Sequence, residues 1–509
     1  MSVEGGVLVL DFGSQYTQLI ARRLRDLNVY SEIHPFDLSL EEIKKRKPAG
    51  IVISGGPSSV TEKDSPLRDT KELIEIAPVL GICYGMQLIA QDLGGKVHAS
   101  GHREYGRKTI NWKTPLKDVK ESHQVWMSHG DVVDELPKGF EWIAFSDTGA
   151  PAAMRGPRVL ALQFHPEVTH SEMGMEILDH FISNYTKVDR SWKPKAIVDH
   201  LKEGILEKLD SNDHVLCALS GGVDSTVVGT LLTKTLGADR VHCVFVNNGL
   251  LRKNEFDEVL GIYKTLGLNV LGVDAEKEFL SALKGVTDPE IKRKTIGRLF
   301  IEVFEKTKSQ LPPLKWLAQG TLYPDVIESV NLRGSSVTIK SHHNVGGLPE
   351  KMNLKLVEPL RELFKDEVRE VGEQLGIPKD ILWRHPFPGP GLAVRVLGEI
   401  TKERLDILRE VDAVFIAALR EFGLYDQIWQ AFSVLLPVQS VGVQGDGRTY
   451  ANCVALRAVV SRDGMTADWF DFPSDFLKTV SNRITNKVKE VNRVVYDITS
   501  KPPGTIEWE

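Results

Sequence analysis

The sequence predicts an α/β protein built of two doubly wound α/β domains followed by a smaller α+β domain. At roughly 150 residues per domain, a chain of 509 residues has room for about three domains. In two long stretches, short apolar runs alternate with helical patterns, which is typical of parallel sheets covered by helices on both faces. Polar or Pro/Gly-rich segments interrupt this alternation, and we therefore expect domains at residues 1–190, 191–384 and 385–509.

The first domain is expected to combine a parallel sheet with antiparallel or mixed strands. Continuous apolar runs predict buried strands at residues 7–10, 50–54 and 78–82, with helices over 15–27 and 87–93. Beyond residue 100, apolar and polar residues alternate as in half-buried strands, at residues 108–112, 142–146 and 159–164. A helix over 173–185 ends the domain, and the polar residues 186–194 form a linker.

The second domain repeats the parallel pattern, and the third mixes helices with alternating strands. Helices are predicted over 197–209, 226–236 and 255–266, and strands over 215–219, 241–246 and 270–273. Residues 385–391 are too rich in Pro and Gly for a helix or a central strand and mark the second boundary. Beyond them we predict helices over 402–422 and 477–491 and strands over 434–444 and 453–461.

Composition disfavours several classes of protein, although local basic sites remain possible. The 63 Lys+Arg and 69 Asp+Glu residues give a net charge of −6, which disfavours nonspecific binding of nucleic acid because that affinity comes from clustered basic residues. No apolar run approaches the roughly 18 residues that span a bilayer, and the N-terminus is not a basic leader, so a cytoplasmic protein is expected. The four cysteines form no C-x-x-C pair.

One of these cysteines, Cys83, lies in the sequence Gly-Ile-Cys-Tyr-Gly at residues 81–85, between a predicted strand and a predicted helix. This order is typical of a nucleophile elbow, in which glycines permit a sharp turn and the next amide faces the oxyanion. The nearby helix N-terminus also lowers the pKa of a thiol. A small core cysteine in a Gly-rich turn is the alternative.

The tripeptide His165-Pro166-Glu167 supplies the missing partners of a cysteine nucleophile. In an extended chain, residues two apart project to the same side, so His165 and Glu167 can address one point. A thiol needs a base, and a carboxylate behind the imidazole fixes its tautomer. By itself the tripeptide is more often a surface turn, but with the elbow it favours a Cys83–His165–Glu167 triad. Gly55-Gly56-Pro57 could supply a second oxyanion amide, or be only a loop.

The first 190 residues resemble the class I glutamine amidotransferases, through Asp-Phe-Gly-Ser-Gln at 11–15, Ser-Gly-Gly-Pro at 54–57, the elbow, Met-Ser-His-Gly at 127–130 and Gln-Phe-His-Pro-Glu at 163–167. The resemblance implies hydrolysis of glutamine through a thioester on Cys83, with release of ammonia. It further implies that the oxyanion and the glutamine are held by Gly56, Tyr84, Gln87, Ser128, His129 and Gly130.

A second glycine turn, Ser-Gly-Gly-Val-Asp-Ser at 220–225, joins a predicted strand to a helix and presents amides and hydroxyls to an anion. It is not a Walker A loop, since the lysine of that motif is absent; a capped helix start, with Asp224 or Ser225 as N-cap, is the alternative. The six residues resemble the pyrophosphatase loop (PP-loop) of ATP-dependent adenylating enzymes. The resemblance implies that ATP is bound by Ser220, Gly221, Gly222, Val223, Asp224, Ser225 and Thr226.

Two polar clusters follow this loop. Asp325 and Glu328 could bind Mg2+, which prefers hard oxygen ligands and shares them with nucleotide phosphates. The His-His-Asn run at 342–344 has no reliable metal spacing. A solvated loop is the alternative for both.

The complete chain resembles the glutamine-hydrolysing GMP synthase family, through Ile-Gly-Arg at 296–298, residues 385–391, Gln-Gly-Asp-Gly-Arg at 444–448 and the Pro-Pro-stiffened tail at 501–509. The resemblance implies adenylation of XMP by ATP, displacement of AMP by ammonia, and a homodimer formed by the third domain. Candidate XMP-binding residues are Arg298, Gln444, Lys501, Thr505, Ile506 and Glu507.

Three other functions would share part of this pattern. An amidotransferase that supplies ammonia to another adenylated acceptor, as in NAD synthesis, would share the second loop but should lack this tail. A tRNA-modifying enzyme would need a basic face or a relay cysteine, which the net charge and the apolar settings of Cys217 and Cys243 disfavour. A scaffold protein would need neither the elbow nor the phosphate loop.

Overall fold

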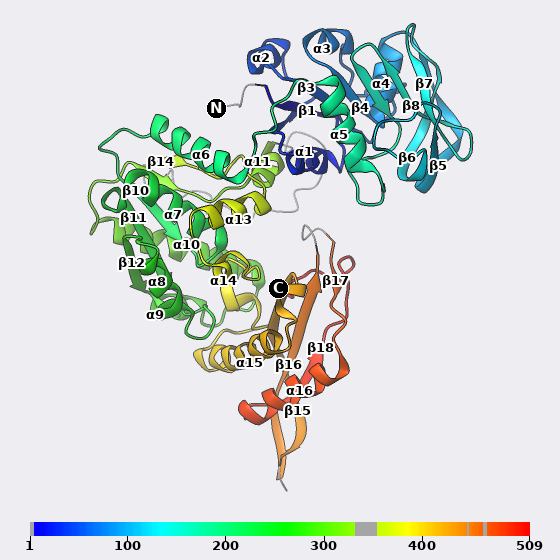
Figure 1. Cartoon of the computed structure of the whole chain (residues 1–509). Helices are drawn as coiled ribbons and strands as arrows, with labels where there is room; N and C mark the ends of the chain where they lie inside the picture. The colour runs from blue at the N-terminus through cyan, green and yellow to red at the C-terminus, as the bar shows by residue number, and fades with distance from the viewer. Residues whose placement is uncertain (1–4, 331–353, 445–446, 462–465) are drawn as a thin grey trace. The chain divides into compact units, whose positions relative to one another are not determined.

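The computed structural model describes residues 5–330, 354–444, 447–461 and 466–509, without the side chains of residues 100–103, 328–330 and 444. The chain divides into two compact units, residues 1–197 and 198–509 (Figure 1). The first division lies close to the predicted boundary at residue 190, whereas the predicted boundary at 384 lies inside the second unit. The three-part division stays a prediction.

The first unit is a nine-stranded mixed sheet with strand order β2-β1-β3-β4-β9-β8-β7-β5-β6. Strands β2, β1, β3, β4 and β9 are parallel, and the remaining four pair antiparallel. The predicted change of pattern is confirmed for β5 and β7, whereas β9, expected to be half-buried, is fully buried and pairs parallel with β4. The strands are β1 (Val7–Asp11), β2 (Ser31–Pro35), β3 (Gly50–Ile53), β4 (Val79–Ile82), β5 (Lys96–Trp112), β6 (Ser122–Glu135), β7 (Glu141–Ser146), β8 (Pro151–Gly156) and β9 (Val159–Leu162).

The helices of this unit follow from its apolar spacing and caps. Along α1, Ile20, Ala21 and Leu24 are buried, as expected of one helical face. At the start of α3, the carboxylate of Asp69 accepts hydrogen bonds from two first-turn amides. The helices are α1 (Thr17–Asp26), α2 (Leu40–Arg46), α3 (Thr70–Ile76), α4 (Tyr84–Asp92) and α5 (Gly174–Tyr185); α6 (Pro194–Lys208) crosses the division between the units.

The second unit begins with a five-stranded parallel sheet of order β12-β11-β10-β13-β14, as a doubly wound domain requires. Its strands are β10 (Val215–Leu219), β11 (Val241–Asn247), β12 (Val270–Asp274), β13 (Trp316–Ala318) and β14 (Lys355–Val357). Its helices are α7 (Val223–Leu236), the 3-10 turn η1 (Ala238–Arg240), α8 (Glu255–Thr265), α9 (Glu276–Leu283), α10 (Pro289–Lys308), α11 (Tyr323–Val330), α13 (Lys365–Gln374) and α14 (Lys379–Leu382).

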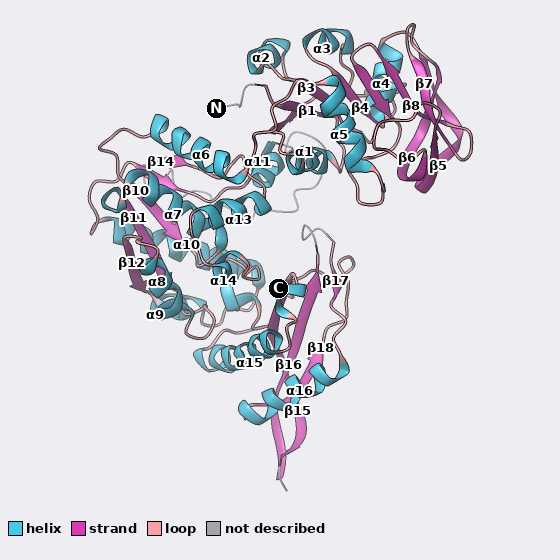
Figure 2. Ribbon diagram, in the orientation of Figure 1, coloured by secondary structure: helices cyan, strands magenta, loops and turns pink. Residues whose placement is uncertain are grey.

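The end of the second unit is a smaller α+β layer with a long antiparallel hairpin (Figure 2). Strands β15 (Gln430–Gln444), β16 (Gly447–Val460) and β17 (Asp468–Trp469) are antiparallel, and β18 (Val491–Tyr496) pairs parallel with β16. Its helical elements are η3 (Gly391–Val394), α15 (Lys402–Glu421), η4 (Tyr425–Gln427) and α16 (Ser474–Lys487). One apolar core runs from Leu216 of β10 to Val491 of β18.

The helix predicted over 477–491 was wrong at its C-terminal end. Helix α16 ends at Lys487, and Val491 instead begins strand β18. The β-branched residues of that strand pair with β16, a partner far away in the sequence. Among the described residues, none of the helices combines the length and the apolar character that crossing a membrane requires.

Candidate active sites

The turn between β4 and α4 is a nucleophile elbow. Cys83 has φ +52°, which is uncommon for a non-glycine residue and marks a strained turn. At Gly85 a Cβ would lie 2.4 Å from the carbonyl oxygen of Ile53, so the close approach of α4 to β3 requires glycine. The predicted elbow geometry is confirmed, with α4 beginning at Tyr84 and not at residue 87.

The predicted triad residues lie together and are buried. Nδ1 of His165 lies 2.7 Å from Oε1 of Glu167, whose side chain is completely buried. Burial by itself would lower the pKa of His165, but the Glu167 carboxylate and the Cys83 thiol outweigh it and raise that pKa well above its usual range. A Cβ at Gly55 would lie 3.0 Å from Cε1 of His165 and 3.7 Å from Cβ of Cys83, so this segment lines the same site.

The reason for this proximity differs from the predicted one. Strand β9 ends at Leu162, and residues 163–167 bend and turn instead of continuing an extended chain. His165 and Glu167 therefore meet across a turn. The alternation argument for side chains two residues apart was wrong, although the contact it predicted is present.

Of the residues implied to hold glutamine, Ser128 contacts Cys83 and Tyr84 follows it directly in the chain. The thiol of Cys83 lies 3.5 Å from the carbonyl oxygen of Ser128, to which it can donate. Nε2 of Gln87 donates to the carbonyl of Asp131 at 3.1 Å, so Gln87 supports the 128–131 segment that contains Gly130. The Tyr84 hydroxyl instead donates to the carbonyl of Pro66. At Gly56 a Cβ would lie 2.8 Å from the carbonyl oxygen of Phe12, so only glycine fits.

Glu104, a buried acid that was not predicted from the sequence, supports strand β6 beside the 128–131 segment. Oε1 of Glu104 accepts hydrogen bonds from Ser146 at 3.1 Å and Thr148 at 2.7 Å, and Oε2 lies 3.3 Å from Nε2 of His129. Burial lowers the pKa of His129, although the carbonyl of Asp131 and Glu104 oppose it. Glu104 and His129 are directly paired across β5 and β6. Their approach depends on that register, which no local pattern could reveal.

Replacing Glu167 with glutamine should destabilise the first unit more at pH 6 than at pH 9. A histidine whose pKa rises on folding stabilises the folded chain fully below its unfolded pKa of about 6.5, and this contribution is lost as pH rises through the folded pKa. The melting temperature of Glu167→Gln should therefore fall furthest below that of the wild type at pH 6. Glu121→Gln, at an exposed position, is the control. A deficit that grows with pH would contradict the assignment.

The second predicted loop lies at the carboxyl end of β10, where it turns into α7, as expected of a nucleotide site in a parallel sheet. Gly221 has φ +78°, and Gly222 is the N-cap of α7 in place of Asp224 or Ser225. The hydroxyl of Ser220 lies 3.1 Å from that of Ser225. Val223 and Thr226 pack inward, with Thr226 donating to the carbonyl of Gly222.

Two cations at this loop come from distant positions. Nζ of Lys365, the first residue of α13, lies 2.5 and 2.6 Å from the two carboxylate oxygens of Asp224. Arg384 approaches the carbonyl of Gly221 at 3.4 Å and pairs with Glu255 at 2.8 Å. The sequence analysis missed both residues, because neither lies in a recognisable motif.

The predicted metal residues lie in helix α11. Oδ2 of Asp325 accepts a hydrogen bond from the amide of Leu322 at 2.9 Å, so one of its oxygens caps the helix start. The side chain of Glu328 and the 342–344 run lie outside the described residues. No cluster of three or more metal-binding side chains occurs in the part of the chain that the structure describes.

The tail at 501–509 is packed against neighbouring elements of the second unit. Both oxygens of Glu507 bind Arg395, at 2.8 and 3.1 Å, and Gln430 donates to one of them at 2.8 Å. Ile506 packs in an apolar cluster with Phe432 and Val434. The backbone of Lys501 pairs with Ala467. Gln430 and Arg395 are further residues that the sequence analysis missed.

The remaining candidate residues, Thr505, Arg298 and Gln444, lie in three different segments. The carbonyl of Thr505 accepts a hydrogen bond from Arg457 at 3.2 Å. Arg298 is exposed on α10 and pairs with Glu302 at 2.6 Å. The backbone of Gln444 ends β15, and its side chain lies outside the described part.

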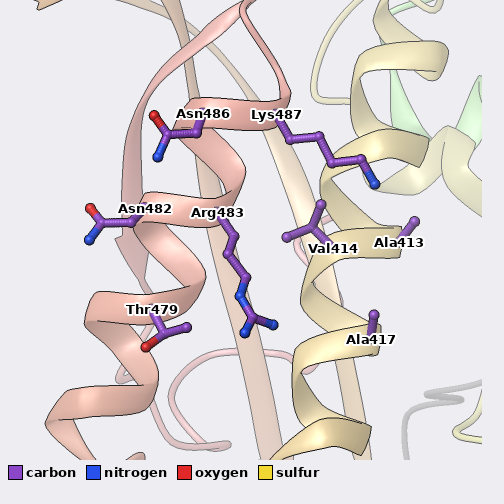
Figure 3. Close-up of a pocket in the computed structure, with 8 residues that line it drawn as sticks. All are labelled: Ala413, Val414, Ala417, Thr479, Asn482, Arg483, Asn486 and Lys487. Atoms are coloured by element: carbon purple, nitrogen blue, oxygen red, sulfur yellow. The ribbon is translucent and has the colours of Figure 1, made fainter.

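A groove of about 630 Å³ lies between α15 and α16 (Figure 3). Arg483 and Lys487 extend from α16 toward α15, and Val414 faces them. None of the candidate site residues whose side chains the structure describes lines this groove. It is therefore separate from both candidate sites.

Comparisons with known proteins divide the chain among three family models. Residues 8–184 match "Glutamine amidotransferase class-I", residues 194–297 match "NAD synthase", and residues 417–508 match "GMP synthase C terminal domain". A "GMP synthase (glutamine-hydrolyzing)" from Bdellovibrio bacteriovorus is 65% identical over 504 residues, covering 99% of this chain and 100% of the relative. The chain belongs to the glutamine-hydrolysing GMP synthase family.

Other members of the GMP synthase family match the same length. The relative from Cytophaga hutchinsonii is 55% identical over 509 residues, and that from Brachyspira hyodysenteriae is 53% identical over 510, each alignment covering 99% of both chains. The resemblance to this family is therefore confirmed over the whole chain. The class I amidotransferase match contains the Cys83 triad, and the "NAD synthase" match contains the 220–226 loop.

Proposed function

We propose that this chain makes GMP from XMP, ATP and glutamine. One observation carries the proposal. This member of the family contains both a buried Cys83–His165–Glu167 triad and a separate loop in which Asp224 pairs with Lys365. The first site releases ammonia, and the second activates the acceptor. The enzyme is thus a ligase that forms a C–N bond with glutamine as nitrogen donor.

At the first site, Cys83 attacks the side-chain amide of glutamine. His165 takes the thiol proton and gives it to the departing ammonia, while Glu167 holds the imidazole through Nδ1. Amides of Gly56 and Tyr84 face the developing oxyanion, and the 128–130 segment holds the glutamine. Water then hydrolyses the thioester to glutamate.

At the second site, O2 of XMP attacks the α-phosphate of ATP and pyrophosphate leaves. Ammonia then displaces AMP at C2 to give GMP. The loop at 220–226 holds the phosphates through its amides and hydroxyls at the start of α7. The adenylation is needed because a carbonyl oxygen is otherwise a poor leaving group.

Mg2+ fits this second site as a cofactor shared with ATP. The carboxylate of Asp325 supplies hard oxygen ligands, although one of its two oxygens accepts a hydrogen bond at the helix start. Glu328 follows one turn later on α11. Such a donor set suits Mg2+, which usually takes one or two carboxylates and completes its coordination with phosphates and water. When bound, the ion offsets the charge of the departing pyrophosphate.

The last part of the chain completes the XMP site and pairs two subunits. Arg298, Gln444 and the tail residues Lys501, Thr505, Ile506 and Glu507 are the proposed XMP-binding set. The exposed apolar residues Val441, Val443 and Tyr450 on the β15–β16 hairpin support a homodimer formed by this part. Sedimentation equilibrium should give twice the chain mass of 56.8 kDa; a single-chain mass at micromolar concentration would contradict the dimer. A cytoplasmic location stays a prediction.

The decisive assay supplies glutamine, ATP and Mg2+ with a panel of acceptors. With XMP we expect GMP, AMP and pyrophosphate in equal amounts, and no AMP or pyrophosphate when Mg2+ is chelated. The match to "NAD synthase" makes deamido-NAD the appropriate competing acceptor. AMP release with deamido-NAD but not with XMP would replace this proposal with the alternative.

A further inference from the structure

Three completely buried cations hold the end of the chain. Lys292 on α10, Arg395 at the end of η3 and Arg457 on β16 have side chains with no exposed surface. Lys292 pairs with Glu509, Arg395 with Glu507, and Arg457 with Asp497. Buried charges are tolerated only when they are paired and hydrogen-bonded, so these contacts hold the tail in one position.

Lys292 joins three segments that are far apart in the sequence. Its ammonium donates to the carbonyls of Ala393 at 3.2 Å and Val396 at 2.9 Å, and to Oε2 of Glu509 at 2.5 Å. The other oxygen of Glu509 accepts a hydrogen bond from the amide of Gly398 at 3.2 Å. All three donors of the ammonium are used, and the segment after η3 and the tail are both fastened to α10.

Removing either partner of the Lys292–Glu509 pair has a different consequence for the tail. Without Glu509, Lys292 would remain a buried cation with only two neutral acceptors, which is far less favourable than an apolar side chain of the same length. Without Lys292, Glu509 loses its charged partner and the tail loses its contact with α10. The tail position therefore depends on both partners.

We propose that the Lys292–Glu509 pair is a positioning device that holds residues 501–509 in the XMP-binding arrangement before the nucleotide arrives. The proposal rests on the assignment of the tail to the XMP site. Preorganisation of this kind raises affinity because the bound conformation costs less to reach. In this proposal neither residue touches the reacting atoms, and both act through the tail.

The test uses the full chain with Glu509→Met, Lys292→Met and the double variant. Ammonia-dependent GMP synthesis should show KM for XMP raised about tenfold in Glu509→Met, with KM for ATP and kcat at saturating XMP within about twofold of the wild type. The double variant should have a KM for XMP closer to the wild type than Glu509→Met, because it removes the unpaired cation. Preserved kcat verifies that the variants fold.

Hydrogen exchange without any nucleotide gives an independent readout. Amides of residues 497–509 should exchange faster in Glu509→Met. In the double variant they should exchange at an intermediate rate, because the unpaired cation is gone but the tail contact with α10 is still missing. Arg293→Met is the matched control, since it removes a cation from an exposed pair with Glu290 on the same helix. Unchanged tail exchange would overturn the positioning role. Faster exchange with an unchanged KM for XMP would overturn it also, and would show that the tail does not hold XMP. Failure of the wild type to make GMP would refute the proposed function itself.

Discussion

Cys83→Ala is expected to abolish glutamine-dependent GMP formation, by a factor of at least about 10³, while ammonia-dependent formation continues near the wild-type rate. The thiol is the nucleophile in the proposed reaction, and no other group near His165 can form the thioester. The loop proposed to adenylate XMP belongs to the other compact unit, and in the proposed reaction free ammonia can replace glutamine as its nitrogen source. Both activities are followed by the AMP released from ATP and XMP, with either glutamine or ammonium as nitrogen source.

Cys453→Ala is the matched control, because it removes another buried thiol that takes no part in the proposed chemistry. It should keep both activities. Loss of glutamine-dependent and ammonia-dependent synthesis together in a folded Cys83→Ala protein would refute the division of labour between the two units.

Asp224→Ala should stop pyrophosphate release from ATP and XMP with either nitrogen source, with a loss of at least about 10²-fold. The carboxylate fixes Lys365 beside the loop through contacts of 2.5 and 2.6 Å. Without the Asp224 carboxylate, Lys365 is no longer held where its ammonium can bind the phosphates of ATP. The measurement is a coupled pyrophosphate assay at saturating ATP.

Asp239→Ala removes the same charge from an exposed position in the turn after α7 and should leave the rate unchanged. Normal pyrophosphate release by Asp224→Ala would exclude the loop from the adenylation step. A Lys365→Met variant that matches Asp224→Ala would support the pair as a unit.

The elements that could be predicted are those whose signal is local. The elbow at 81–85 and the loop at 220–225 each depend on glycines between a strand and a helix, and both turns form as predicted. The change from parallel to antiparallel strands was visible as a change from continuous to alternating apolar residues. The helix predicted over 477–491 failed at its end because pairing with β16 overrides local propensity.

The supporting residues could not be predicted in the same way. Glu104 approaches His129 only through the register of β5 and β6, and Lys365 reaches Asp224 across 141 residues. Lys292 and Glu509 are 217 residues apart. Charged residues of these kinds are frequent, and a single sequence does not say which of them the fold buries.

By itself, the sequence determined the α/β class and the family to which the chain belongs, and it predicted Cys83 with its two partners and the loop at 220–226 as the sites. These features are encoded in short segments, where glycine conformation and residue spacing restrict the possible structures. Only the tertiary structure decided which cations hold Asp224 and the tail, and that His165 meets Glu167 across a turn. Such contacts depend on burial and on register between distant segments, where desolvation makes pairing obligatory.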